Sequence, residues 1–402
     1  MTAPTRVREQ DLLSLYNDPD TCPTDSLKPV PLAEEPAFIS WQQDIPRAYL
    51  EMSPEELERR IKAVRARLGK RLVVLGHHYQ RDEVIQYADF TGDSFKLAQA
   101  AAAQDEAEFV LFCGVHFMAE SADILTREDV RVILPNMAAG CSMADMADPG
   151  DVYGAWDEIN EALEGSAKVI PITYMNSAAS LKAFVGEREG IVCTSSNARK
   201  TFDYAFARGE KIFFFPDQHL GRNTGYEMGI PLDQMVLWNW RKPLGGLTKE
   251  QIERAKVILW QGHCSTHQRF SVAQIEKARR EHPGVNVIVH PETSWEVVQA
   301  ADDSGSTEKI IKVVSEAPAG TTWAVGTEIN LVSRLAKANP DKTVFCLDPV
   351  VCPCSTMYRI HPAYLAWTLE GLAAGHVVNE VKVDAETRKW SLVALERMLA
   401  LV

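Results

Sequence analysis

Short apolar runs rich in β-branched and aromatic residues alternate along the chain with amphipathic stretches. The runs begin at residues 71, 109, 131, 168, 211, 256, 285, 321 and 343, and read RLVVLG, FVLFC, RVIL, KVIPIT, KIFFF, KVIL, VNVIV, TTWAVG and TVFCL. Each has the length of one strand, whereas SVAQIEKARREH at 271 has the apolar spacing of a helix. Alternating strands and helices are typical of parallel sheets covered on both faces, so we predict an α/β fold.

The beginning of the chain has a different pattern. Residues 1–45 carry several prolines among polar residues, which predicts an extended N-terminal arm. Ser53-Pro54-Glu55-Glu56 is typical of a helix start, and Gly69 of a helix end. No apolar stretch reaches the roughly 18 residues of a membrane span, and the N-terminus lacks the apolar core of a signal peptide. We therefore expect a cytoplasmic protein without membrane contact.

A weak repeat divides the chain into three parts. Three predicted strands end in polar clusters, at His77-His78-Tyr79, Tyr174-Met175-Asn176 and His290-Pro291-Glu292. A hydroxyl-containing cluster follows each, at Gly92-Asp93-Ser94, Thr194-Ser195-Ser196 and Gly305-Ser306-Thr307, and a Cys-Ser pair closes each part, at Cys141, Cys264 and Cys354. The spacing from histidine to cysteine is 64 residues in both the first and the third part.

Three related α/β units are the simplest explanation of this repeat. We predict a first unit at 46–160, a second at 161–280, and a third with C-terminal helices at 281–402. Accidental spacing is the alternative, because many α/β strands end in polar residues.

Composition narrows the possible partners. The chain of 402 residues has 46% hydrophobic and 24% charged residues, which is typical of a globular protein. Its net charge of −13 argues against nucleic acid or an anionic membrane surface as the main partner, because phosphate groups are bound by basic surfaces. Local groups can still bind a small anion.

The cysteines point to a metal. Eight cysteines without a secretion signal favour metal or catalytic roles over a disulfide framework, although a lone cysteine is more often a small core residue. Three cysteines, one per unit, suit a site where the units meet. Structural zinc and electron-transfer clusters normally have four protein ligands, whereas three cysteines on a 4Fe-4S cluster leave one iron free as a Lewis acid. Such an iron favours dehydration, because it accepts the charge of a leaving hydroxide.

One choice among the cysteines of the third unit follows from spacing. Cys354 is followed by serine and lies 64 residues after His290, as Cys141 lies after His77. Cys346 falls inside a predicted strand, where a buried apolar role is expected. Cys352 is separated from Cys354 by one proline, which disfavours convergence of both sulfurs on one iron.

The polar clusters supply groups for chemistry, and each has a structural alternative. His77 and His290 could bind carboxylate or phosphate. Ser94, Ser195 and Thr307 could donate to anionic oxygens or could cap helices, and a helix N-terminus serves both purposes. Glu292 could be a general base, and Tyr79 and Tyr174 could transfer protons or orient a substrate. His263 and His267 flank Cys264, whereas His116 and His219 are weaker candidates.

These segments resemble the signature segments of the quinolinate synthase family. The matching segments are GHHYQ, GDS, CGVHFMAE, AAGCSMAD, YMNS, CTSSNA, FPDQHLG, GHCSTH, VIVHPE, GSTEKI, VGTE and CPCSTM, in order over roughly residues 50–360. The resemblance implies three α/β/α domains with parallel sheets around a pseudo-threefold axis. It also implies condensation of iminoaspartate with dihydroxyacetone phosphate to quinolinate, with loss of phosphate and water, in NAD biosynthesis. An aspartate oxidase would supply iminoaspartate.

The resemblance also implies roles for individual residues. One 4Fe-4S cluster would be held by Cys141, Cys264 and Cys354. Tyr79, Tyr174, His267 and Glu292 would lie at the chemistry. The substrate pocket would be lined by His77, Ser94, Tyr174, Asn176, Ser195, His290, Glu292 and Thr307. The resemblance gives the N-terminal arm no role.

Two other functions remain open at this point. A zinc or iron hydrolase could use His77, His78 and Glu292, but it leaves the Cys-Ser repeat unexplained. An iron-sulfur carrier or redox sensor would need the cysteines but not the polar clusters at the strand ends.

Overall fold

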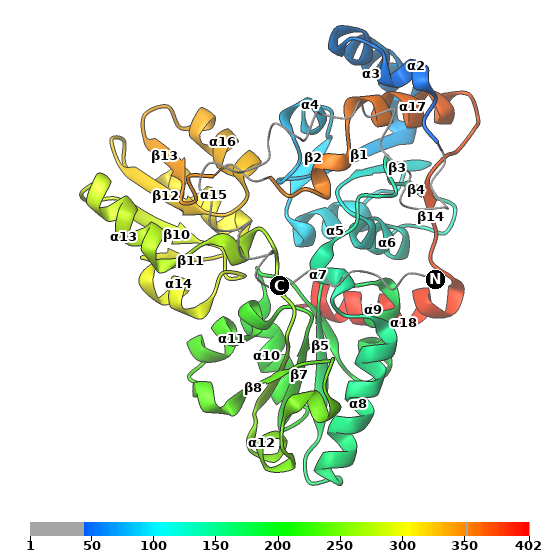
Figure 1. The fold of residues 1–402 in the computed structure, drawn as a ribbon. Coiled ribbons are helices and arrows are strands. Elements are labelled where there is room, and N and C mark those ends of the chain that lie inside the picture. The colour runs from blue at the N-terminus through cyan, green and yellow to red at the C-terminus, as the bar shows by residue number, and fades with distance from the viewer. Residues whose placement is uncertain (1–43, 351–352, 402) are drawn as a thin grey trace, which may run out of the picture.

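Three separate sheets form three lobes of the molecule (Figure 1). The structure, a computed structural model, describes residues 44–350 and 353–401, so nearly all of the predicted arm and Cys352 lie outside it. Every strand pair within the described residues is parallel except one, formed by β14 and β4. Because helices alternate with these parallel strands, the predicted α/β fold is confirmed.

The first sheet has the strand order β14-β4-β3-β1-β2. Its strands are β1 (Leu72–His77), β2 (Phe90–Gly92), β3 (Phe109–Cys113), β4 (Arg131–Ile133) and β14 (Glu380–Val381). The helices of this part of the chain are α2 (Arg47–Leu50), α3 (Pro54–Leu68), α4 (Asp82–Ile85), α5 (Ser94–Ala102), α6 (His116–Leu125), α7 (Ser142–Asp145) and α8 (Pro149–Leu163). Helix α3 begins after Ser53, whose hydroxyl accepts from the Glu56 amide, and ends before Gly69, as expected.

The second sheet has the order β6-β5-β7-β9-β8. It contains β5 (Val169–Tyr174), β6 (Ile191–Cys193), β7 (Lys211–Phe215), β8 (Met235–Trp238) and β9 (Val257–Trp260). Its helices are α9 (Ala179–Glu187), α10 (Ala198–Phe206), α11 (Gln218–Glu227) and α12 (Lys249–Arg254). The strands are buried along nearly their whole length, which explains their almost unbroken apolar sequences.

The third sheet has the order β11-β10-β12-β13. Its strands are β10 (Asn286–Val289), β11 (Asp303–Ser304), β12 (Thr322–Gly326) and β13 (Thr343–Cys346). Its helices are α13 (Val272–Glu281), α14 (Trp295–Ala300), α15 (Thr307–Glu316) and α16 (Ile329–Ala338). The same motif recurs in all three sheets: a central strand (β1, β5 or β10) pairs with a short strand (β2, β6 or β11) and with a third strand (β3, β7 or β12). The carboxyl ends of the central strands carry the polar clusters found in the sequence.

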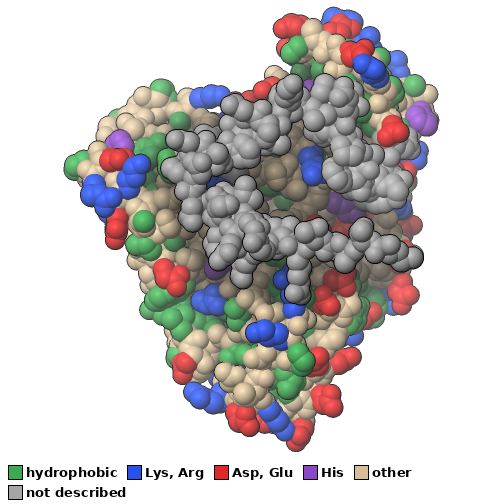
Figure 2. Space-filling view, in the orientation of Figure 1, with side chains coloured by type: hydrophobic (Ala, Val, Ile, Leu, Met, Phe, Trp, Pro, Cys, Tyr) green, Lys and Arg blue, Asp and Glu red, His purple; other side chains and the backbone are tan. Residues whose placement is uncertain are grey.

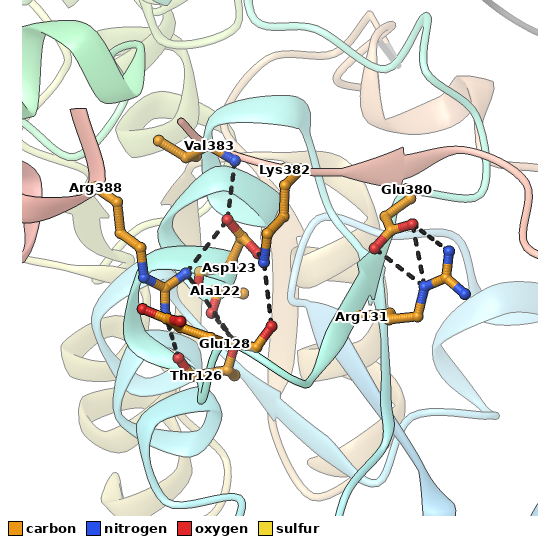
Figure 3. Close-up of polar contacts among 9 residues, drawn as sticks. All are labelled: Ala122, Asp123, Thr126, Glu128, Arg131, Glu380, Lys382, Val383 and Arg388. Atoms are coloured by element: carbon orange, nitrogen blue, oxygen red, sulfur yellow. Dashed lines mark hydrogen bonds and ion pairs between the residues drawn. The ribbon is translucent and has the colours of Figure 1, made fainter. Parts of the chain in front are cut away.

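The C-terminal segment leaves the third sheet and packs on the other two. Helix α17 (Pro362–Ala373) contacts α3, strand β14 pairs with β4, and helix α18 (Ala385–Leu399) contacts α9. Asp123 fastens this segment, because its buried carboxylate accepts from the Val383 amide at 2.9 Å and from Lys382 at 3.2 Å, and lies next to Arg388 (Figure 3). The unit boundaries stay a prediction, and the C-terminal helices belong by packing to the first and second sheets.

Charges of both signs lie on one face of the molecule. On the face shown in Figure 2, Lys and Arg side chains lie interspersed with Asp and Glu side chains among the coloured residues. Among the described residues no helix is long and apolar enough to cross a membrane.

Candidate functional site

The residues selected from the sequence converge on one pocket where the three units meet. All the residues to which the resemblance gives a role line it, except His267, although they come from all three predicted units. The lining residues among them are His77, Tyr79, Ser94, Cys141, Tyr174, Asn176, Ser195, Cys264, His290, Glu292, Thr307 and Cys354. The cavity that they enclose has a volume of about 70 Å³.

The three cysteines reach the pocket from equivalent short turns. Cys141 precedes α7, Cys264 precedes the 3₁₀ turn His267–Arg269, and Cys354 precedes the 3₁₀ turn Met357–Arg359. None forms a disulfide, and the three thiols are close enough to influence one another's ionisation. Burial raises the pKa of Cys141 to about 12, so this thiol stays protonated unless a cation binds beside it. The donor set and its environment therefore fit a bound metal centre.

His77 and His290 occupy equivalent turns and have the same tautomer. The amide of Tyr79 donates to His77 Nδ1 at 3.1 Å, and the amide of Glu292 donates to His290 Nδ1 at 3.3 Å. A ring nitrogen that accepts a hydrogen bond carries no proton, so each neutral ring has its proton on Nε2. Burial lowers the pKa of both rings, that of His290 to about 3. Both histidines are thus neutral hydrogen-bond donors toward the pocket.

Glu292 is the centre of a buried hydrogen-bond network. Its Oε1 accepts from the Tyr174 hydroxyl at 2.5 Å, and its Oε2 lies 2.7 Å from His267 Nδ1. Burial by itself raises the pKa of Glu292, but the neighbouring His267 and the hydrogen bonds from His267 and Tyr174 hold this pKa well below its usual value. The carboxylate therefore stays ionised and accepts a hydrogen bond from His267 Nδ1.

His267 continues the network behind the pocket lining. Its Nε2 lies 3.1 Å from the Thr327 hydroxyl, which in turn lies 2.9 Å from the Tyr79 hydroxyl. An acid, a histidine and a hydroxyl linked in this order form the arrangement of a hydrolase triad. Burial, followed by the charge of Glu292, raises the pKa of Tyr79 well above its usual value, so this phenol keeps its proton.

Sequence reasoning missed Thr327. It lies directly after β12, next to the N-cap of α16, in the VGTE segment that was noticed without assigning a role to any of its residues. Its hydroxyl could be placed between Tyr79 and His267 only once all three units were brought together. The position after a strand was the available signal.

The hydroxyls of Ser94 and Thr307, at the starts of α5 and α15, do not cap these helices. Asp93 caps α5 and Ser306 caps α15, so the hydroxyls of Ser94 and Thr307 remain available to the pocket. Both residues begin helices whose N-termini favour anions. Ser195 lines the same pocket, and Asn176 Oδ1 is buried without a hydrogen-bond partner among the described residues. Such an unpaired atom suits a ligand contact.

The hydrolase set from the sequence is not assembled. His78 Nε2 lies 2.8 Å from Glu308 Oε1, whereas His77 and Glu292 face the pocket. Within the described part of the chain, the group whose ligand atoms are close enough for a single metal ion, within 4.8 Å of one another, is Cys264, His267 and Glu292. His219 is hydrogen-bonded to Gln268 at 2.6 Å, and Cys346 is half-buried with its thiol near the Thr327 carbonyl.

Comparison with known proteins identifies the family. The family model described as "Quinolinate synthetase A protein" matches residues 59–400. The chain is 59% identical over 367 residues to the quinolinate synthase of Corynebacterium glutamicum, covering 91% of this chain and 93% of that one. It is 57% identical over 353 residues to that of Acidobacterium capsulatum, covering 87% and 94% of the two chains. It is 53% identical over 365 residues to that of Rhodopirellula baltica, covering 88% and 93%. The chain is therefore an enzyme of the quinolinate synthase family.

Proposed function

We propose that the chain condenses iminoaspartate with dihydroxyacetone phosphate to quinolinate, with loss of phosphate and water, and holds a 4Fe-4S cluster for this purpose. The observation that supports this proposal most strongly is the meeting of three cysteines, one from each unit, with an acid-base network in one pocket. A carrier or sensor of electrons has no need of that network.

Cys141, Cys264 and Cys354 are the proposed ligands of the cluster. With three protein ligands, the bound cluster supplies one open iron that acts as a Lewis acid toward a substrate hydroxyl or carboxylate oxygen. The protein supplies buried thiols, and Val115, Phe117 and Met118 form an apolar wall that limits access of water.

The substrates are anions, and the pocket binds anions by neutral donors. His77 and His290 each direct an Nε2 proton inward, and the helix starts at Ser94 and Thr307 add hydroxyls and a favourable dipole. Asn176 and Ser195 complete the donors on the side of the second unit. Because these donors carry no net charge, they hold carboxylate and phosphate groups without forming ion pairs that would slow product release.

Proton transfer is assigned to the network around Glu292. Ionised Glu292 accepts a hydrogen bond from His267 Nδ1 and so fixes the tautomer and orientation of the ring, as the acid of a triad does. His267 Nε2 and Thr327 then exchange a proton with Tyr79, whose raised pKa keeps the phenol protonated until a leaving hydroxide accepts that proton. Tyr174 is held on the other oxygen of Glu292, where it fixes the carboxylate.

An anaerobic activity assay tests the proposed reaction. Cluster-loaded protein is mixed with dihydroxyacetone phosphate and freshly generated iminoaspartate, and quinolinate and phosphate are quantified. We expect both products in equal amounts. Loaded protein that forms no quinolinate would contradict the proposal and favour an iron-sulfur carrier or redox sensor.

Three further expectations belong to the same proposal. They are an aspartate oxidase as the source of iminoaspartate, a cytoplasmic location, and the absence of nucleic-acid and membrane partners. The mixed charge of the face in Figure 2 supports the third of these.

A further inference from the structure

Side chains from neighbouring units hold the turns that carry Tyr79 and Glu292, and two of them, Asn223 and Arg334, each bond two carbonyls of a turn, whereas Asn330 bonds only the Tyr79 carbonyl, at 3.3 Å. Asn223 in α11 donates its amide to the carbonyl oxygens of Pro291 and Thr293, both at 2.9 Å. These two residues flank Glu292 in the chain. Arg334 in α16 donates to the carbonyl oxygens of His78 and Gln80, the latter at 2.7 Å. Those two residues flank Tyr79.

The two turns have the same construction. In each, the amide two residues after a histidine donates to that ring, and the next amide donates to the histidine carbonyl, for Gln80 and Thr293 alike at 3.0 Å. Tyr79 and Glu292 therefore occupy the same position in equivalent turns. The carbonyls that flank them accept hydrogen bonds from outside the turn, from Asn223 and Arg334.

The two donors also occupy equivalent positions. Arg334 lies six residues after Glu328, the N-cap of α16, and Asn223 lies six residues after Asp217, the N-cap of α11. Both N-cap carboxylates accept amides of the first helical turn. The recurrence indicates a feature of the repeat rather than a chance contact.

At the third junction between units, the side chain six residues after the N-cap makes a different contact with the neighbouring turn. Ser121 lies six residues after Val115, the N-cap of α6, and its hydroxyl lies 3.5 Å from the Met175 sulfur. Met175 and Ser177 flank Asn176, and the Ser177 carbonyl is bonded instead by buried Lys182. The contacts run in a cycle: the first unit reaches the second, the second reaches the third, and the third reaches the first.

We propose that Asn223 and Arg334 are positioning residues that fix Glu292 and Tyr79 across the unit boundaries. The expected effect on kcat rests on the proposed function. The expected effect on the order of the two turns rests on their hydrogen bonds alone. Glu292 and Tyr79 belong to one hydrogen-bond network but to different units. The network therefore keeps its geometry only while both turns are held from the neighbouring units.

The first test measures amide hydrogen exchange in the loaded protein. Asn223→Ala should speed exchange in residues 290–295 and leave residues 77–82 unchanged, and Arg334→Ala should do the reverse. Asn339→Ala and Arg397→Ala are matched controls. Asn339 is 7% exposed like Asn223 and bonds one helix carbonyl, while Arg397 bonds the carbonyls of Gly186 and Gly190 far from these turns. Unchanged exchange in both turns would overturn the proposal whether or not the protein makes quinolinate.

The second test is a double-mutant cycle on kcat. Each single variant should lower kcat by about 10- to 100-fold with little change in KM, because small displacements of reacting groups have effects of this size. In a Glu292→Gln background Asn223→Ala should cost little more, and in a Tyr79→Phe background Arg334→Ala should cost little more. The proposal would be wrong if Asn223→Ala and Arg334→Ala lowered kcat by the same factor in every background, or if both single variants kept full activity.

Two further variants distinguish the hydrogen bonds from Arg334 to the backbone carbonyls from its ion pair with Asp82. Arg334 also pairs with Asp82 at 2.9 Å, so Asp82→Asn should leave kcat unchanged. Arg334→Lys keeps the charge but not the planar fork that reaches two carbonyls, so it should lose most of the activity that Arg334→Ala loses. If Asp82→Asn lowered kcat as much as Arg334→Ala does, the ion pair and not the carbonyl bonds would hold the turn, and the proposal would be wrong.

Discussion

The tautomer of a histidine decides what it can bind. His77 and His290 both accept a backbone amide on Nδ1, and burial keeps their pKa low, so each presents one Nε2 proton and no charge. The same local bond occurs at His361, where it caps α17, which shows that the turn itself selects the tautomer. A histidine in this turn is therefore preset as a donor to an anionic oxygen.

Substitution of His290 tests this preset donor. Glutamine places an amide nitrogen near the position of Nε2, whereas asparagine places one near Nδ1 and leaves the Nε2 position empty. We expect His290→Gln to keep substrate KM within about tenfold of wild type and His290→Asn to raise it further, since a hydrogen bond to a charged group contributes about 1.5–3 kcal/mol. Steady-state kinetics with dihydroxyacetone phosphate provide the comparison. The assignment is wrong if asparagine is the better substitute.

Glu292 accepts hydrogen bonds from both Tyr174 and His267, so we expect its negative charge to matter more for activity than its side-chain volume. Glu292→Gln keeps the side-chain volume but removes the carboxylate that orients His267. We predict an intact metal centre and a loss of activity of about 10²- to 10⁴-fold, the range for acid-base groups. A loss below tenfold would remove Glu292 from proton transfer. The ultraviolet-visible spectrum of the loaded variant serves as the control for the metal centre.

At the scale of elements, most of the fold could be predicted. Each of the nine apolar runs became a strand, and the Ser271 start of α13 has a complete capping box with Gln274. The strands that were missed are β2, β6, β8, β11 and β14. They have two to four residues, and β11 contains only Asp303 and Ser304, so it has no apolar run to recognise. Such strands form because the edge of an existing sheet accepts their backbone.

The close contact between α9 and α18 makes a prediction about stability. A Cβ on Gly186 would lie 2.0 Å from the Trp390 carbonyl oxygen, so the two helices must separate to accept a side chain there. We expect Gly186→Ala to lower the free energy of unfolding by about 1–3 kcal/mol. Gly154→Ala, in a solvent-exposed part of α8 with nothing within 4 Å, should instead be neutral or stabilise by up to about 1 kcal/mol. Thermal or chemical unfolding of both variants distinguishes them, and equal stabilities would contradict this packing argument.

At the scale of the whole molecule, the site could be predicted only in part. The repeated Cys-Ser pairs and strand-end clusters pointed to one shared pocket, because residues at equivalent places in a repeat converge on the axis of that repeat. The contributions of Thr327, Asn223 and Arg334 were not visible in the sequence. Each depends on a contact between units, and their sequence separations from Tyr79 and Glu292 carry no periodic signal.

The C-terminal segment was also beyond prediction. Its helices follow the third unit in the chain but pack on the first and second, and the buried carboxylate of Asp123 anchors them (Figure 3). Asp123 lies in a helix pattern that looks ordinary in the sequence. Only the return of residues 380–388 gives its carboxylate a partner.

The central claim is that one cysteine from each unit holds a four-iron cluster, and the iron and acid-labile sulfide content of anaerobically purified protein tests it most directly. We predict about four irons and four sulfides per chain for wild type and for Cys346→Ser, because Cys346 lies in β13 outside the pocket lining. Cys354→Ser should lose the cluster. One zinc per chain without sulfide, or a full cluster in Cys354→Ser, would contradict the account.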